Sequence, residues 1–220
     1  MPSVDHMFNQ GMLNLLLDRA LSGLPPKLPR EFVEVGLFTN LVRLTDKSLR
    51  EYDAARFELF DYLDGWAAEP RKGLRTSPYI RAIDHMENVF SALARGINCI
   101  DRLRSRGVDR DGPKISSTLR EDVTRMRDMV EHADDRLTKS SARVSRPNFE
   151  QGQPYALRLE NEFMLLGNWM VRYDDLVTII SLLYETVASI RGTSAAGRNH
   201  PQAVARTSVV FIGTHHPAGH

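Results

Sequence analysis

The residues most suited to chemistry are gathered in one charge-rich stretch that runs from Met126 to Leu137. Arg127 could hold a phosphate through two parallel N–H donors of its guanidinium. His132 could take up and release a proton, because the reference pKa of imidazole lies near neutral pH. Asp128 lies one helical turn before His132 and could orient the imidazole or raise its pKa. These groups match the needs of phosphodiester cleavage without a metal ion.

The spacing of Arg127 and His132 sets a geometric condition on that chemistry. Side chains five positions apart on a regular helix point about 140° apart, because each residue turns the helix by about 100°. One copy of this helix therefore cannot direct both groups at one phosphate. A second copy of the chain, which presents the same patch again, would remove the difficulty. The catalytic interpretation therefore predicts a homodimer.

A structural interpretation of the same stretch stays open. Arg127 can pair with Glu131, four residues further along a helix. Asp128 can pair with His132 at the same spacing. Such pairs stabilise a solvated helix face by only ~0.2–0.5 kcal/mol each. The excess of acidic residues around His132 would also repel the phosphates of RNA.

The pattern Arg127-x4-His132 resembles the signature of the HEPN superfamily, whose name stands for higher eukaryotes and prokaryotes nucleotide-binding. In that family a polar residue follows the arginine, and here it is Asp128. The acid-rich turn before Arg136 is similar to that of bacterial members, and the resemblance extends over residues 30–191. Members of the family are compact α-helical bundles, and many are metal-independent ribonucleases of toxin and defence systems.

The resemblance implies a reaction and a set of partners. Two motif helices would meet in a homodimer that cleaves RNA and leaves a 2′,3′-cyclic phosphate and a 5′-hydroxyl. Arg127, Asp128 and His132 would form the catalytic set, with no cofactor and no metal. A cognate neutralising protein would be a further partner. One departure is Asp134, which stands where a toxin subgroup has a tyrosine, and it weakens the idea of silencing by nucleotide transfer onto that tyrosine.

The main alternative is a non-catalytic helical bundle that binds a protein or a nucleotide. Helical di-metal carboxylate enzymes carry Glu three residues before His on two helices. No histidine of this chain has Glu at that position, so no metal site is expected. His85, between Asp84 and Glu87, is expected to be an ordinary helix histidine. Cys99 is the single cysteine, which excludes an intramolecular disulfide and predicts a small buried thiol.

Length and composition are those of an ordinary globular domain. The chain has 220 residues, of which 42% are hydrophobic and 26% charged, and its formal net charge is +1. This length accommodates one domain with a buried core. The near-neutral total gives no overall attraction to nucleic acid, so RNA binding would need a local basic surface. No signal peptide or membrane span is recognisable, and a cytoplasmic protein is expected.

Apolar periodicity predicts an all-α fold, an up-and-down bundle of four to five helices with the option of a short β-hairpin before the last helix. The expected helices cover residues 6–22, 30–68, 77–107, about 116–137 and 174–191. Ser77 before Pro78 is expected to cap the third of them, and residues 155–171 would form the hairpin. Residues 1–192 would make one helical domain, and residues 193–220 a flexible tail.

The end of the helix predicted at 77–107 is basic, with Arg102, Arg104 and Arg106 in its last turns. Cations there are favoured by the negative end of the helix dipole by ~0.3–1 kcal/mol, which explains the cluster structurally. The same cluster could contact an RNA backbone. Its position relative to His132 would distinguish the two interpretations.

Overall fold

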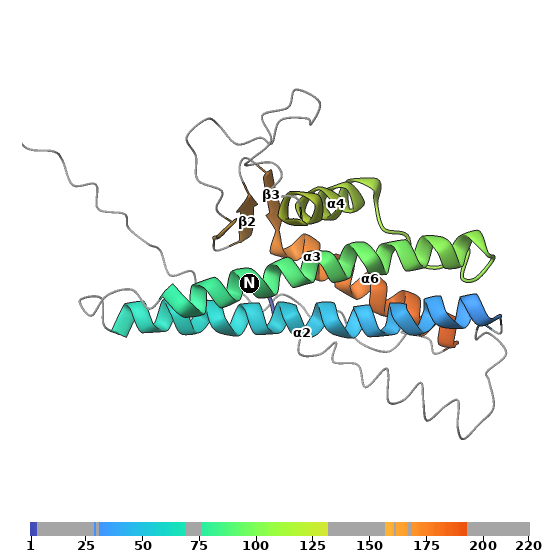
Figure 1. Cartoon of the computed structure of the whole chain (residues 1–220), viewed down its shortest axis with the longest axis horizontal. Helices are drawn as coiled ribbons and strands as arrows, with labels where there is room; N and C mark the ends of the chain where they lie inside the picture. Colours follow the sequence, from blue (N-terminus) through green and yellow to red (C-terminus); the bar gives the residue numbers. More distant parts are fainter. Residues whose placement is uncertain are drawn as a thin grey trace, which may run out of the picture.

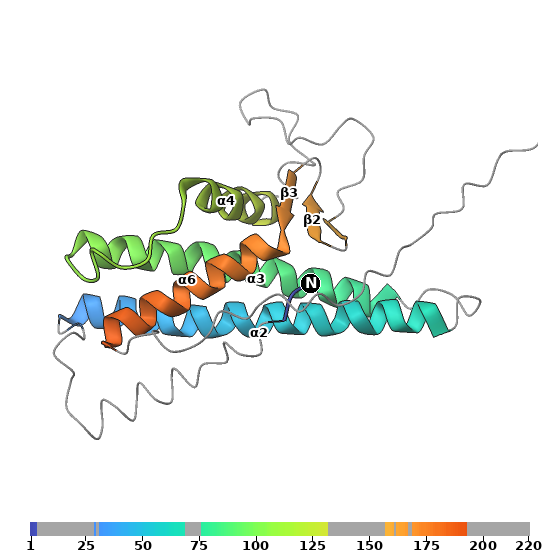
Figure 2. The same ribbon diagram turned by 180° about the vertical axis from the view of Figure 1, so that it is seen from behind.

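The computed structural model describes residues 1–3, 29, 31–68, 76–131, 157–160, 162–166 and 169–192. In chain order these residues form the helices α2 (Phe32–Ala68), α3 (Thr76–Ser105) and α4 (Ser117–Glu131), the strands β1 (Leu157–Leu159), β2 (Phe163–Leu166) and β3 (Trp169–Arg172), and the helix α6 (Tyr173–Arg191). Figure 1 shows α2 and α3 side by side along the long axis, with α4 and the strands to one side of them. Figure 2 shows α6 crossing the opposite face of this helix pair.

The helices α2 and α3 pack antiparallel and form the centre of the fold. Asn40 Nδ2 near the start of α2 donates to Cys99 Sγ near the end of α3 at 3.4 Å. At the other end of the pair, Arg81 forms an ion pair with Glu58 at 2.7 Å. The largest fully buried side chains of the two helices are Leu41, Leu44, Tyr52, Met86, Phe90, Leu93, Ile100 and Leu103. These side chains lie at helical spacing, which is the signal that predicted both helices.

α2 is a single continuous helix, and the sequence had left one long helix or two collinear ones open. Thr45 and Ser48 are buried in its interior. The Thr45 hydroxyl donates to the backbone oxygen of Leu41 at 2.9 Å, and the Ser48 hydroxyl donates to that of Thr45 at 2.8 Å. Because both hydroxyls are satisfied by the helix itself, this polar segment does not interrupt α2.

The helix predicted at 77–107 is confirmed as α3, with small differences at its ends. It begins at Thr76, so Ser77 lies in the first turn and is not the N-cap that was predicted. The Ser77 hydroxyl instead accepts a hydrogen bond from Arg81 Nη1 at 2.7 Å. Beyond the other end the chain turns at Gly107, whose φ of 92° lies in the left-handed region that favours glycine.

The strands form an antiparallel sheet in the order β1-β2-β3. The register pairs Leu159 with Met164, and Phe163 with Arg172. The two-stranded hairpin predicted at 155–171 is therefore wrong in its strand number. The apolar run that was expected to form one strand makes both β2 and β3, and the glycine–asparagine pair between them in the sequence is of the kind that favours a hairpin turn.

α6 follows β3 directly and packs on the α2–α3 pair. Gly96 of α3 lets it approach closely, because a Cβ at that position would lie 3.1 Å from Leu183 Cδ1. α6 ends at Gly192, whose φ of 73° is again left-handed. The helix predicted at 174–191 is thus confirmed to within one residue.

The described residues are mostly helical, as predicted, and the small sheet is the main addition. The helix predicted at 6–22, the tail predicted at 193–220 and the part of the motif helix after Glu131 lie outside the described residues. Within the part of the chain that the structure describes, no helix combines the length and the apolar character needed to cross a membrane.

Candidate functional site

α4 carries the first half of the Arg-x4-His motif and lies against α3. The buried side chains of α4 are Val123, Met126 and Met129. Near the start of α4, Arg120 Nη1 bonds Asp101 Oδ2 of α3 at 2.5 Å. Because α4 runs back along α3 from this point, its last turn with Arg127 lies beside the first half of α3.

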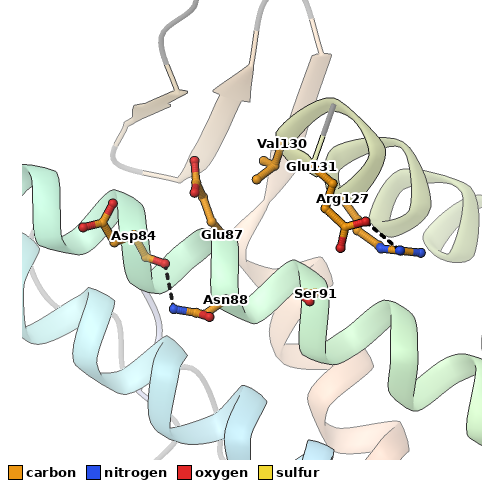
Figure 3. A pocket seen from close by; sticks show the side chains of 7 residues that line it. All are labelled: Asp84, Glu87, Asn88, Ser91, Arg127, Val130 and Glu131. Atoms are coloured by element: carbon orange, nitrogen blue, oxygen red, sulfur yellow. Dashed lines mark hydrogen bonds and ion pairs between the residues drawn. The ribbon is translucent and has the colours of Figure 1, made fainter. Parts of the chain in front are cut away.

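A cleft of about 250 Å³ lies between the last turn of α4 and α3 (Figure 3). Its α3 wall is formed by Asp84, Glu87, Asn88 and Ser91, and its α4 wall by Arg127, Val130 and Glu131. The volume is slightly below that of ordinary small-molecule pockets, so the cleft suits one chemical group of a larger ligand. Carboxylates outnumber the single guanidinium in the lining by three to one.

Arg127 is the one cation in this lining, and its guanidinium is partly engaged. Arg127 Nη2 lies 2.6 Å from Glu131 Oε2, so the pairing foreseen by the structural interpretation is present. The hydrogen bond to Glu131 raises the pKa of Arg127, while burial opposes the rise. The Nε atom of Arg127 is buried and has no hydrogen-bond partner among the described residues. One N–H donor of the guanidinium is therefore left unused in the cleft wall.

The cleft lining formed by the described residues does not include the other two residues of the predicted catalytic set. Asp128 is half-buried on α4 and does not belong to the cleft lining. His132 follows α4 directly in the sequence but lies outside the described residues. The pairing of Asp128 with His132 therefore stays a prediction.

Glu87 is a candidate that sequence reasoning passed over. Its half-buried side chain reaches toward the cleft from α3 (Figure 3). Burial raises the pKa of the Glu87 carboxyl, and the negative charge of Asp84 raises it further. Such a carboxyl can hold a proton closer to neutral pH than an exposed one can. The sequence alone gives no sign of this, because part of the wall around Glu87 comes from α4.

Two other reactive side chains of α3 have structural partners. His85 Nδ1 lies 2.7 Å from Glu51 Oε2 on α2, which suits an ordinary histidine between helices. Cys99 is buried, as predicted, and accepts the hydrogen bond from Asn40. Burial raises the pKa of the Cys99 thiol, which favours the unreactive protonated form.

The cleft thus combines a group that binds anions with a group that can hold a proton. Arg127 supplies a partly available guanidinium, and Glu87 supplies a carboxyl of raised pKa. Among the described residues no set of His, Cys, Asp and Glu side chains is arranged to hold a metal ion. Comparison of the chain with known protein families, with curated proteins and with solved structures finds no match.

Proposed function

We propose that the protein is a metal-independent endoribonuclease of the HEPN type that acts as a homodimer through Arg127, Asp128 and His132. The observation that supports this best is the position of Arg127, which lines a cleft with its Nε–H buried and without a partner. A buried donor without a partner costs about 1–3 kcal/mol, so a rotation of the side chain that turns this N–H toward an anionic oxygen in the cleft would gain a hydrogen bond that no described residue uses. His132 comes directly after Glu131, which is part of the same cleft wall.

The reaction requires proton transfer at two oxygens and positive charge beside phosphorus. One His132 takes the proton of the 2′-hydroxyl, whose oxygen attacks phosphorus. His132 of the partner subunit donates a proton to the 5′-oxygen as the bond between phosphorus and that oxygen breaks. Arg127 stabilises the negative charge that develops on the nonbridging oxygens. The products are a 2′,3′-cyclic phosphate and a 5′-hydroxyl, and no cofactor takes part.

A phosphate that binds Arg127 must compete with the ion pair between Arg127 and Glu131. Both side chains are about one-third exposed, at 32% and 35%. A pair with this exposure is worth ~0–1 kcal/mol, so a bidentate phosphate can displace Glu131 or bind the remaining donors. Glu131 would then act as a weak competitor that leaves when RNA arrives.

RNA as the substrate implies a location and a further partner. The protein acts in the cytoplasm, where RNA is abundant. A cognate protein neutralises it there, because an unrestrained ribonuclease would damage the cell that makes it.

The test is cleavage of a labelled RNA in EDTA by the full chain and by the variants His132→Ala and Arg127→Ala. The matched control is Arg81→Ala, because Arg81 also forms an ion pair on a helix surface but does not line the cleft. We expect His132→Ala and Arg127→Ala each to lose about 10²–10⁴-fold in rate while light scattering shows an intact dimer, and the control to keep its rate. Cleavage that persists in His132→Ala, or a wild-type chain that cleaves no RNA, overturns the proposal.

The carboxylates of the cleft support a second candidate, a non-catalytic bundle that binds a protein partner. Asp84, Glu87 and Glu131 would receive a lysine or arginine side chain of that partner. In this case the wild-type chain cleaves no RNA but binds an arginine-rich peptide in calorimetry. Asp84→Asn combined with Glu87→Gln would remove this binding, and His132→Ala would leave it intact.

A further inference from the structure

The outward face of α3 changes from acidic to basic as it leaves the cleft. At about 100° per residue, the side chains of this face project within about 40° of one direction. They are Asp84, Asn88, Ser91, Arg95, Asn98 and Arg102. α6 packs on another side of α3, where Gly96 faces Leu183. The outward face lies between the side of α3 that carries Cys99, which Asn40 of α2 contacts, and the side that carries Asp101, which Arg120 of α4 contacts.

α2 adds two cations to this surface. Lys47 Nζ donates to Asn88 Oδ1 at 3.2 Å, so it lies at the edge of the cleft. Arg43 is exposed, and its Nη2 donates to Asn40 Oδ1 at 2.9 Å. Asn40 in turn bonds Cys99, which places Arg43 at the junction of α2 and α3.

Three arginines converge around this junction. Burial raises the pKa of the Cys99 thiol, and the hydrogen bond from Asn40 and the positive charges of Arg102, Arg95 and Arg43 all act against that rise. Arg95 and Arg102 lie four residues before and three residues after Cys99 on α3, and Arg43 bonds the Asn40 side chain that donates to Cys99. Together with Lys47 they form a surface that we name the basic strip: Arg43, Lys47, Arg95 and Arg102.

Several other cations of the described residues are held in ion pairs, unlike those of the basic strip. Arg81 pairs with Glu58, Arg120 with Asp101, and Arg127 with Glu131. No cation of the basic strip has a carboxylate within 4.0 Å among the residues that the structure describes. Unpaired cations placed side by side repel one another, so an extended polyanion would stabilise this surface. Arg95 and Arg43 lie in helix interiors, where the helix dipole offers no explanation for them.

We propose that the basic strip binds the phosphodiester backbone of a single nucleic-acid strand and leads it to the cleft at Arg127. From Asn88 to Arg102 the face extends ~21 Å at 1.5 Å per residue. A stacked strand carries a phosphate about every 3.4 Å, so about six phosphates fit this length. The inference rests on the proposed function, because RNA is the strand that the cleft would cut.

Phe32 supplies a second feature of a single-strand site. Its side chain is 92% exposed at the start of α2. At 100° per residue it projects about 20° from the direction of Arg43, so both lie on the same side of α2. Gly36 lies between them, and no atom of the described residues approaches within 4 Å of the position where its Cβ would be. An exposed ring on the same side of α2 as Arg43, about 16 Å along the helix, suits base stacking, which single-strand binders combine with backbone contacts.

The test measures binding of a fluorescent RNA oligonucleotide by the full chain carrying His132→Ala, so that the RNA stays intact. In this background, Arg95→Gln with Arg102→Gln is compared with the control Arg81→Gln with Arg158→Gln. The control removes the same charge from exposed arginines outside the basic strip. Circular dichroism verifies that both double variants fold.

We expect the strip variant to bind roughly 20-fold more weakly at about 0.1 M salt, and its salt slope to fall by about 1.4, because each contact to a single strand contributes about 0.7. The control should lose far less. Binding of the matching DNA strand with equal strength identifies the shared backbone as the ligand, and tighter RNA binding identifies RNA. Both results support the proposal.

Equal weakening of RNA binding in the strip and control variants would overturn the assignment of the basic strip as the binding site, because the loss of net charge would then explain the effect. Competition by polyglutamate as strong as that by RNA also overturns it and indicates an acidic protein partner. The two proposals fail separately in these experiments. A wild-type chain that binds RNA through the strip without cutting it overturns only the ribonuclease, and a chain that cuts RNA without needing the strip overturns only the strip.

Discussion

The inner and outer faces of α3 differ in how their composition changes along the helix. The inner face is apolar from one end to the other, with Met86, Phe90, Leu93, Ile97 and Ile100 all buried. The charge of the outer face changes along α3, from carboxylates at the cleft to arginines of the basic strip that have no carboxylate partner among the described residues. The inner face specifies how the helix packs, because burial of apolar surface needs only a repeating pattern. The role of the outer face depends on the residues that α2 and α4 place beside it.

The largest expected effect on stability comes from removing a buried side chain of the inner face. Phe90→Ala removes a fully buried ring from the core and should lower the free energy of unfolding by about 3–5 kcal/mol. Ser91→Ala changes the adjacent residue on the outer face and should stay within about 0.5 kcal/mol of the wild type. Urea denaturation of the two variants measures the difference. A large loss in Ser91→Ala would mean that the outer face is also packed, and the contrast between the faces would disappear.

The acidic end of the outer face offers the next largest effect. Asp84→Asn combined with Glu87→Gln removes two negative charges at the cleft and should strengthen RNA binding about five-fold at low salt, since charges within a Debye length of about 10 Å are felt by the strand. Asp61→Asn with Asp64→Asn removes the same charge from an exposed part of α2 and is the control. Fluorescence anisotropy measures both. Weaker RNA binding in the cleft variant would show that the carboxylates assist the ligand.

The sequence predicted the inner face well and the outer face poorly, for a physical reason. Apolar periodicity marked α2, α3 and α6, because burial is recorded in the spacing of residues on one chain segment. The sequence grouped Arg102 with Arg104, but the structure separates them. Arg104 Nη2 donates to the backbone oxygen of Pro113 at 2.5 Å and lies 3.9 Å from Asp109. Arg102 instead shares its face with Arg95, seven positions away.

The candidate site was predictable only in its α4 half. Arg127 was singled out by its motif, and its pairing with Glu131 followed from helical spacing. Glu87 gave no signal, because its raised pKa comes from burial within the folded chain and from Asp84. The catalytic role of Arg127, and the presence of a partner subunit, stay predictions for the cleavage experiment.

Two helix glycines, one in open space on α2 and one packed on α3, provide a smaller test of packing on the inner face. Gly36→Ala places a methyl group in open space on α2, so it should stabilise the protein by about 0.5–1 kcal/mol through helix propensity. Gly96→Ala places the same group 3.1 Å from Leu183 at the packed junction with α6 and should lack this gain. Thermal unfolding compares the two variants. Equal stabilisation would show that α6 can yield at Gly96 and that the inner face is less tightly packed than its burial indicates.

The smallest expected effect is the contribution of Glu87 to the pH dependence of the free energy of unfolding. Its pKa in the folded protein is raised above the usual 4.5, by burial first and by Asp84 second. Between these two pKa values the folded chain binds more protons than the unfolded chain, so this glutamate lowers stability as pH rises through that window.

Glu87→Gln should remove that loss. The variant should gain on the order of 0.5 kcal/mol or less at neutral pH, and its advantage should vanish at pH values below the usual pKa of glutamate. Glu185→Gln on α6 lies outside the cleft and serves as the control in urea denaturation across pH. If Glu87→Gln instead loses stability at neutral pH, the charged carboxylate has a favourable partner. The acidic end of the outer face would then be a paired surface like that around Arg127, and the contrast with the basic strip would narrow.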